Sequence, residues 1–203
     1  MNPIIVLASA SPRRKHILEK INFKFEVKPS SIIEDYSINL TPKNMAEYWA
    51  LEKARNLLPQ QKNSVVIGAD TIVDLEQKIL GKPRNSSEAK KMLKKLSGKQ
   101  HLVHTGVALR YELLDIEVSF VESTEVYFYN LKDDWIDQYL STNMFLDKAG
   151  AYGIQEWSSV FVKKIHGCYN NVVGFPLASF IQLICSNKIK KEFQLDNWFA
   201  SKK

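Results

Sequence analysis

Residues 4–18 read IIVLASASPRRKHIL and join an apolar run directly to a capped helix. The run Ile4–Ala8 predicts a buried strand. Ser11 is suited to cap a helix, and Pro12 is suited to its first position, so residues 13–21 are expected to be helical. A strand that turns straight into a helix is the repeating unit of α/β proteins.

The rest of the chain continues this alternation. Thr41-Pro42 is a second cap followed by proline, and it opens a helix that includes residues 46–58. Residues 101–111 and 117–129 are rich in Val, Phe and Tyr and predict neighbouring strands. The remaining expected elements are a buried strand over 64–73, a helix over 88–96 capped by Ser86 or Ser87 and ended by Gly98, a helix over 133–140, a loop then strand over 150–165, and a closing helix over 176–189. We therefore predict an α/β fold with a mixed β-sheet flanked by helices.

Length and composition indicate a globular protein. The 203 residues suit one domain, 1–203, and 45% of them are hydrophobic. The net charge of +6 suits an anionic partner, but a lysine-rich solvated surface is the favoured explanation for many of these lysines. Two cysteines without metal-finger spacing fit a reducing, cytoplasmic compartment. The longest apolar stretch, 172–185, is too short for a membrane span and contains Pro176, so no membrane partner is expected.

The turn between the first strand and helix is a candidate phosphate site. Backbone N–H groups and the helix dipole favour an anion at such a junction. Arg13 and Arg14 add guanidinium groups that match phosphate oxygens, and Ser9 lies in the same turn. The alternative is an ordinary helix start with solvated arginines.

Carboxylates and lysines elsewhere suggest a metal and phosphate site. The strand 64–73 is expected to present Asp70 at its C-terminal end, where α/β sites form. Asp70 and Glu34 together offer the oxygen ligands that hard divalent cations prefer. Lys53, on a predicted helix, and Lys82, between Gly81 and Pro83, are candidates for neutralising phosphate charge. The alternatives are an aspartate that caps a turn and lysines exposed to solvent.

The segment 147–155, DKAGAYGIQ, has the glycines of a shaped loop. Gln155 offers both a donor and an acceptor, which suits reading of a base edge, unless the segment is a plain connection. His101 and His104 are three residues apart on a predicted strand. They should therefore face opposite sides and chelate a metal poorly.

Taken in order, these motifs resemble the Maf family of nucleotide pyrophosphatases. The matching strings are LASASPRRKHIL at 7–18, EKA at 52–54, IGADTIV at 67–73, ILGKP at 79–83, LSGKQHLVHTGVAL at 96–109, DKAGAYGIQ at 147–155 and FVKKIHGCYNNVVGFPL at 161–177. The resemblance implies a mixed sheet, two lobes with a cleft between them, and hydrolysis of a nucleoside triphosphate to the monophosphate and pyrophosphate. It also implies a divalent metal, Mg²⁺ or Mn²⁺, as cofactor.

The resemblance assigns roles residue by residue. The family's catalytic aspartate falls on Asp70 and its acidic partner on Glu34, both of them implied metal ligands. The lysines of its motifs fall on Lys53 and Lys82. Its phosphate-contacting positions fall on Ser9, Arg13 and Arg14.

The resemblance also implies a substrate. The branch acting on dTTP and UTP carries the residues found here as Arg13, Thr71 and Gln155. This chain departs from the family at three positions: Glu156 stands where Gly is usual, and Cys168 and Asn170 replace the usual Asp and Tyr.

Other readings of the function stay open beside this one. A modified pyrimidine nucleotide or 7-methyl-GTP is an alternative substrate. A nucleic-acid-binding or division-regulating protein without turnover is the rival class. Against that class, the basic residues of this chain are not interleaved with aromatic residues in one stripe, so no nucleic-acid partner is expected. A homodimer is possible.

Overall fold

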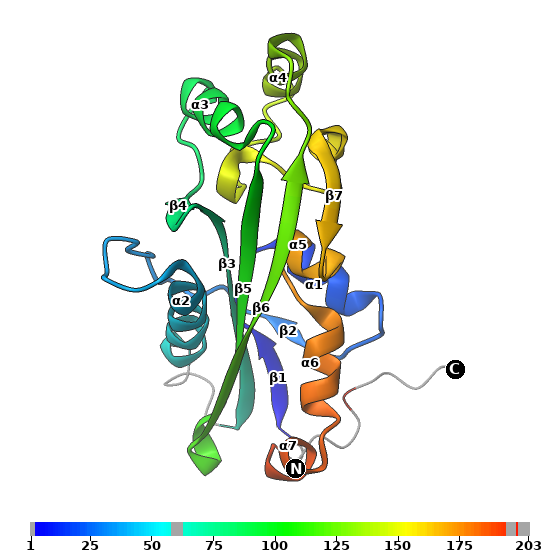
Figure 1. Cartoon of the computed structure of the whole chain (residues 1–203). Coiled ribbons are helices and arrows are strands. Elements are labelled where there is room, and N and C mark those ends of the chain that lie inside the picture. Colours follow the sequence, from blue (N-terminus) through cyan, green and yellow to red (C-terminus); the bar gives the residue numbers. More distant parts are fainter. Residues whose placement is uncertain (1–2, 58–62, 194–197, 199–203) are drawn as a thin grey trace.

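The computed structural model describes residues 3–57, 63–193 and 198, and it places a seven-stranded mixed sheet at the centre (Figure 1). The strands are β1 (Ile4–Leu7), β2 (Glu26–Val27), β3 (Ser64–Leu75), β4 (Lys78–Leu80), β5 (Gln100–Tyr111), β6 (Ile116–Phe128) and β7 (Val162–His166). Their order is β2-β1-β3-β5-β6-β7, with β4 also paired to β3. The β1 strand is parallel to β2 and β3, and the other pairs are antiparallel, which confirms the predicted mixed α/β sheet.

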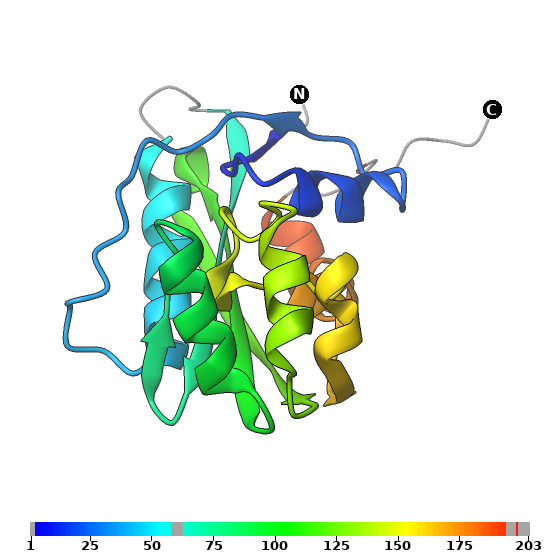
Figure 2. The same cartoon turned by 90° about the horizontal axis from the view of Figure 1, so that it is seen from above.

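Helices cover both faces of the sheet. They are α1 (Pro12–Glu19), α2 (Pro42–Asn56), α3 (Ser86–Leu96), α4 (Asp133–Leu140), α5 (Tyr169–Val173), α6 (Leu177–Ile184) and α7 (Asn187–Glu192), with 3₁₀ turns η2 (Glu112–Leu114), η3 (Ala149–Ala151) and η4 (Trp157–Phe161). Seen from above, α2 (cyan) lies on one side of the central strands, and α1 (blue) and the C-terminal helices (orange to red) lie on the other (Figure 2).

Both predicted proline-led helix starts are confirmed. The Ser11 hydroxyl accepts a hydrogen bond from the backbone N–H of Arg14, and Thr41 does the same for Asn44. Pro12 and Pro42 occupy the first helical positions. The α2 helix ends at Asn56, and Leu58, the expected last helical residue, lies outside the described residues.

Three boundary predictions were wrong. The cap of α3 is Asn85, not Ser86 or Ser87, because the extended Asn85 side chain accepts the N–H of Glu88 at 2.9 Å while the serines already lie in the first turn. The expected closing helix over 176–189 is two helices, since Ser186 caps a separate α7. The strand holding Asp70 runs on to Leu75, so Asp70 lies within it rather than at its end.

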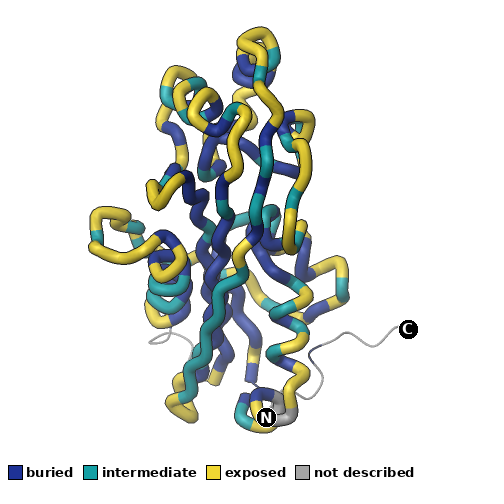
Figure 3. Tube along the Cα trace, viewed as in Figure 1, coloured by how far each residue is buried: buried dark blue, intermediate teal, exposed yellow. Residues whose placement is uncertain are grey.

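Two main hydrophobic cores lie along the sheet. One joins β1, α1 and α6 to the middle strands, and its fully buried residues include Leu7, Leu18 and Phe180. The other lies under α3 and α4 and includes Leu93, Tyr139 and Phe161. Figure 3 shows β3 and β5 buried along most of their length, whereas β6 is mostly of intermediate burial. The assignment of the whole chain to one domain stays a prediction.

The edge of β3 that faces β1 and β4 has a gap. On this side β1 pairs with Ser64–Ile67, and β4 pairs with Val73–Leu75. Among the described strands, none pairs with residues 68–72 on that side. Asp70 and Thr71 lie in the gap and, as successive strand residues, point to opposite faces of the sheet. The gap opens the middle of a buried strand to a cleft.

Candidate active site

A cleft of about 330 Å³ lies over this gap. One wall is the β1–α1 turn together with the end of α5, and the other is formed by the segment after β4 and by residues 147–155. The Gly150 N–H donates to the Gly81 carbonyl at 3.1 Å and so joins the two parts of the second wall. All the predicted site residues line this cleft: Ser9, Arg13, Arg14, Glu34, Lys53, Asp70, Thr71, Lys82 and Gln155.

A buried lysine between two carboxylates forms the floor. Lys53 Nζ lies 2.7 Å from Asp70 Oδ1 and 2.6 Å from Glu34 Oε1. Lys53 is 8% exposed and Asp70 4% exposed, so neither is the solvated surface residue of the simpler reading. Burial raises the pKa of Glu34, but the ammonium groups of Lys53 and Lys82 lower it, and the net pKa lies below its usual value. Both lysines therefore lie close enough to stabilise the ionised Glu34.

The floor of the cleft also offers carboxylate oxygens to a cation. Asp70 Oδ2 is buried and has no hydrogen-bond partner in the described part of the chain, which is costly for a carboxylate oxygen. Asp70 and Glu34 supply two carboxylates, and Mg²⁺ is commonly held by one or two carboxylates plus substrate phosphates. Within the described residues, no group of three or more His, Cys, Asp or Glu side chains forms a complete metal site. The residues fit a divalent cation that also needs oxygens from the substrate.

Arg14 is the centre of a buried hydrogen-bond network. Its guanidinium donates to Ser9 Oγ at 3.0 Å, to Thr71 Oγ1 at 3.0 Å and to the Gly174 carbonyl at 2.9 Å. Burial lowers the pKa of Arg14, and the charge of Asp70 partly offsets that effect. These bonds fix Ser9 and Thr71 relative to each other at the cleft wall.

Arg13 reaches across the cleft mouth instead. Its guanidinium forms an ion pair with Asp147 at 3.0 Å and donates to the Asp147 backbone carbonyl at 3.3 Å. Burial raises the pKa of Asp147, but hydrogen bonds and charges from Lys148 and Arg13 outweigh it and lower that pKa. Arg13 thus joins α1 to the opposite wall.

Lys82 and Gln155 are exposed at the rim of the cleft. Lys82 follows Gly81 and lies on the side of Glu34, whose charge it stabilises. Gln155 lies beyond Ile154 on the opposite segment. Cations therefore lie on the floor and on both walls of the cleft, and the Gln155 amide lies on the second wall.

Sequence reasoning gave no role to three further cleft residues: Tyr36, Asp147 and Lys148. Burial and the charges of Asp70 and Glu34 raise the pKa of the Tyr36 phenol. Its position two residues after Glu34 was the available signal. Asp147 and Lys148 lay within the quoted string DKAGAYGIQ, but only their contacts across the cleft give them a role.

His101 and His104 lie outside this cleft, on β5. His101 contacts Tyr152 on the side of the second core, whereas His104 contacts Ser123 and Asp74. The expected strand is confirmed, and the two rings have separate partners. Neither takes part in the floor or walls of the cleft.

The fold and the cleft define an α/β protein with a cation-lined site for a polyanionic, phosphorylated ligand. Comparison with known proteins agrees with this class. The model of the family described as "Maf-like protein" matches residues 4–187. The chain belongs to the Maf-like protein family.

Relatives and one solved structure extend the comparison. A dTTP/UTP pyrophosphatase of Carboxydothermus hydrogenoformans is 49% identical over 86% of this chain and 93% of its own. A dTTP/UTP pyrophosphatase of Bacillus cereus strain G9842 is 43% identical over 95% and 96%. A HAM1 protein from Coxiella burnetii has the same fold, with a TM-score of 0.52 and 16% identity over 90% of this chain and 99% of that one.

Proposed function

We propose that this chain hydrolyses dTTP and UTP to the monophosphate and pyrophosphate. The observation that carries the proposal is the Glu34–Lys53–Asp70 cluster at the floor of a cleft with arginine and lysine at its walls; Lys53 and Asp70 are buried and Glu34 is partly buried. Relatives that share 43–49% of their residues with it over most of its length are named for this activity.

The phosphate chain of the substrate is assigned to the cationic part of the cleft. Arg13, Lys53 and Lys82 neutralise the phosphate oxygens, and Ser9 donates from the β1–α1 turn, where the start of α1 also favours an anion. Arg14 adds positive charge beside them and also positions Ser9 and Thr71, because three of its five N–H groups donate to Ser9, Thr71 and Gly174. The base is assigned to the side of Gln155.

A divalent cation, Mg²⁺ or Mn²⁺, is part of the proposal. Asp70 and Glu34 would hold it, and when bound it stabilises negative charge on the reacting phosphate oxygens. Asp70 also orients or deprotonates the attacking water through its unpaired Oδ2. Lys53 holds Oδ1, so Asp70 keeps one oxygen in a fixed position.

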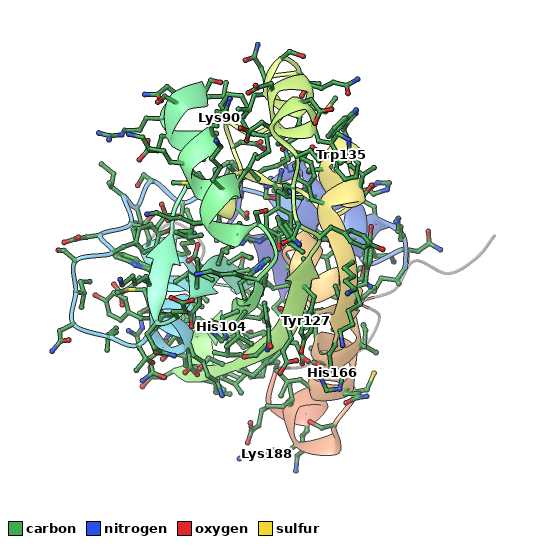
Figure 4. All side chains as sticks on the ribbon, turned by 45° about the horizontal axis from the view of Figure 1, so that its top comes forward. Lys90, His104, Tyr127, Trp135, His166 and Lys188 are labelled. Atoms are coloured by element: carbon green, nitrogen blue, oxygen red, sulfur yellow. The ribbon has the colours of Figure 1, made fainter. Side chains whose placement is uncertain are left out.

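The setting of the activity is also proposed. Both cysteines, Cys168 and Cys185, are unpaired, as expected in a reducing cytoplasm. Among the described residues, no helix is both long and apolar enough to cross a bilayer. Lys90 and Lys188 lie at opposite ends of the molecule, so these two lysines do not belong to one basic patch (Figure 4). A homodimer stays a prediction. Sedimentation tests it by measuring the mass of the protein in solution.

A substrate panel tests the proposal. Pyrophosphate release is measured from dTTP, UTP, CTP, GTP, 7-methyl-GTP and ATP with Mg²⁺ or Mn²⁺. We expect release from dTTP and UTP above all others. Preference for 7-methyl-GTP would keep the chemistry and overturn the pyrimidine assignment, whereas no release from any nucleotide would overturn the proposed function.

A further inference from the structure

A second buried lysine, Lys148, lies in the wall opposite the β1–α1 turn. It is 6% exposed, and its Nζ lies 2.8 Å from Asp147 Oδ1 and 3.0 Å from Glu156 Oε2. The contact with Asp147 is also a hydrogen bond, whereas the contact with Glu156 is an ion pair without hydrogen-bond geometry. Its ammonium also donates to the Met144 carbonyl. A buried ammonium is stable only when paired, and here two carboxylates pair with it. The catalytic cluster described above does not use it.

The turn that carries Gln155 rests on this lysine. A Cβ on Gly153 would lie 2.9 Å from Lys148 Cε, so the Gly153 backbone passes directly over the lysine side chain. Ser158 Oγ accepts from the Gly153 N–H at 2.9 Å and donates to the Gly153 carbonyl at 3.1 Å. The N–H of Glu156 donates to the same carbonyl at 3.0 Å. These hydrogen bonds close the turn over residues 153–158, and the ion pair between Glu156 and Lys148 joins the turn to Lys148.

Gln155 lies between the two attachment points of this turn. Gly153 contacts the stem of Lys148, and Glu156 contacts its ammonium. Within the described residues, the Gln155 side chain forms no hydrogen bond to the protein, and it is exposed at the cleft rim. Its position therefore depends on its two neighbours. Glu156 stands where the family resemblance places glycine, which has no side chain to form such a pair.

We propose that the Lys148–Glu156 ion pair positions Gln155 and thereby sets the base selectivity of the cleft. Both members are positioning residues, because they act on the base through Gln155. The inference rests on the proposed function for the identity of the base. On the other side of Lys148, Asp147 pairs with Arg13, so the same lysine also joins the base side of the cleft to its phosphate side.

The experiment separates base recognition from phosphate binding. Glu156→Gln keeps the shape of the side chain and removes the charge that pairs with Lys148. Values of kcat and KM are measured for UTP and CTP, and the inhibition constant is measured for inorganic tripolyphosphate, which has no base. Gln155→Ala is the positive control. Glu76→Gln is the matched control, since Glu76 pairs with Lys99 at 2.9 Å outside the cleft.

We expect Glu156→Gln to raise the KM for UTP and to lower the preference for UTP over CTP by about tenfold, toward the value of Gln155→Ala. The kcat for UTP and the tripolyphosphate inhibition constant should change by less than about twofold. Combining Glu156→Gln with Gln155→Ala should add little, because both act through one side chain. A merely structural role would instead lower the thermal midpoint without changing selectivity.

Unchanged selectivity in the folded Glu156→Gln variant, with a clear loss in Gln155→Ala, would overturn the inference and leave the proposed function intact. If the wild type releases no pyrophosphate, the proposed function fails by itself. The selectivity is then taken from calorimetric binding of TMP and CMP to the same variants. In that binding experiment, an equal ratio of TMP to CMP affinity in wild type and in Glu156→Gln would also overturn the inference.

Discussion

At the scale of single residues, the site depends on one cation placed between two anions. Lys53 is 8% exposed and contacts both Glu34 and Asp70. Without it, the buried carboxylate of Asp70 and the partly buried carboxylate of Glu34 would lose the cation between them. Removing one partner of a buried ionic group costs more than the pair itself contributes, because the remaining charge is left uncompensated.

Lys53→Met is therefore expected to lower the free energy of unfolding by roughly 3–5 kcal/mol and to reduce kcat/KM by at least about 100-fold. Urea denaturation and pyrophosphate release measure the two effects. Lys94→Met is the matched control, since Lys94 pairs with Asp133 on the exposed surface and should change stability by under about 1 kcal/mol. Equal effects of the two substitutions would contradict the buried cluster.

His101 gives a second prediction at this scale. It is 2% exposed, donates to or accepts from the Tyr152 hydroxyl at 2.8 Å, and burial lowers its pKa to about 3. Between that pKa and the ordinary value of 6.5, the unfolded chain binds the proton and the folded chain does not, so stability falls as pH falls. From pH 6.5 to 4.5 the expected loss is about 2 kcal/mol.

The measurement is the free energy of unfolding at several pH values for wild type and His101→Gln. The variant should lose less stability over this pH range, and the difference isolates His101 from carboxylates that titrate in both proteins. His166→Gln, which changes an exposed histidine, should follow the wild type. Parallel pH curves for wild type and His101→Gln would rule out a buried neutral imidazole.

At the scale of elements, the packing of α2 on the sheet brings Lys53 to Asp70. Gly68 and Gly106 leave no room for a side chain: a Cβ on Gly68 would lie 2.0 Å from the Ala50 carbonyl oxygen, and one on Gly106 would lie 2.2 Å from that of Ala46. Asp70 on β3 pairs with Gly106 on β5, so α2 approaches the sheet closely at the position of Asp70. Gly68 and Gly106 thus determine how closely Lys53 on α2 approaches Asp70 on β3.

Gly68→Ala should push α2 away from β3, cost about 3 kcal/mol of stability and lower turnover by moving Lys53. Gly81→Ala is the control for stability, because a Cβ there meets nothing within 4 Å. It should stay within about 0.5 kcal/mol of wild type. Chemical denaturation of both variants checks this, and a neutral Gly68→Ala would show that α2 does not rest on the strand backbone.

The same elements show what sequence could and could not predict. Local signals were sufficient for the Ser11 and Thr41 caps, since each depends on neighbours three residues away. The burial of Lys53 could not be derived locally, because it depends on a strand far along the chain. The position of Asp70 within a strand was missed because the gap between β1 and β4, not the end of β3, exposes it. The nine site residues came from motif order, and their contacts came from the fold.

At the scale of the whole molecule, the cleft is bridged by the Arg13–Asp147 ion pair, which joins α1 to the opposite wall. A substrate phosphate that binds Arg13 must compete with this carboxylate. Asp147→Asn should therefore bind inorganic tripolyphosphate more tightly by about two- to fivefold, as an exposed ion pair contributes at most about 1 kcal/mol. Calorimetry of binding measures this. Weaker binding would instead make Asp147 part of the phosphate site.

The most direct test of the account identifies the products formed from dTTP by wild type and by Asp70→Asn in the presence of Mg²⁺. The substitution removes one charge from the floor and keeps the shape of the side chain. We predict equal amounts of dTMP and pyrophosphate from the wild type and a loss of at least about 100-fold in the variant. Formation of dTDP and phosphate, or nearly equal turnover in Asp70→Asn, would contradict the assignment of this cleft.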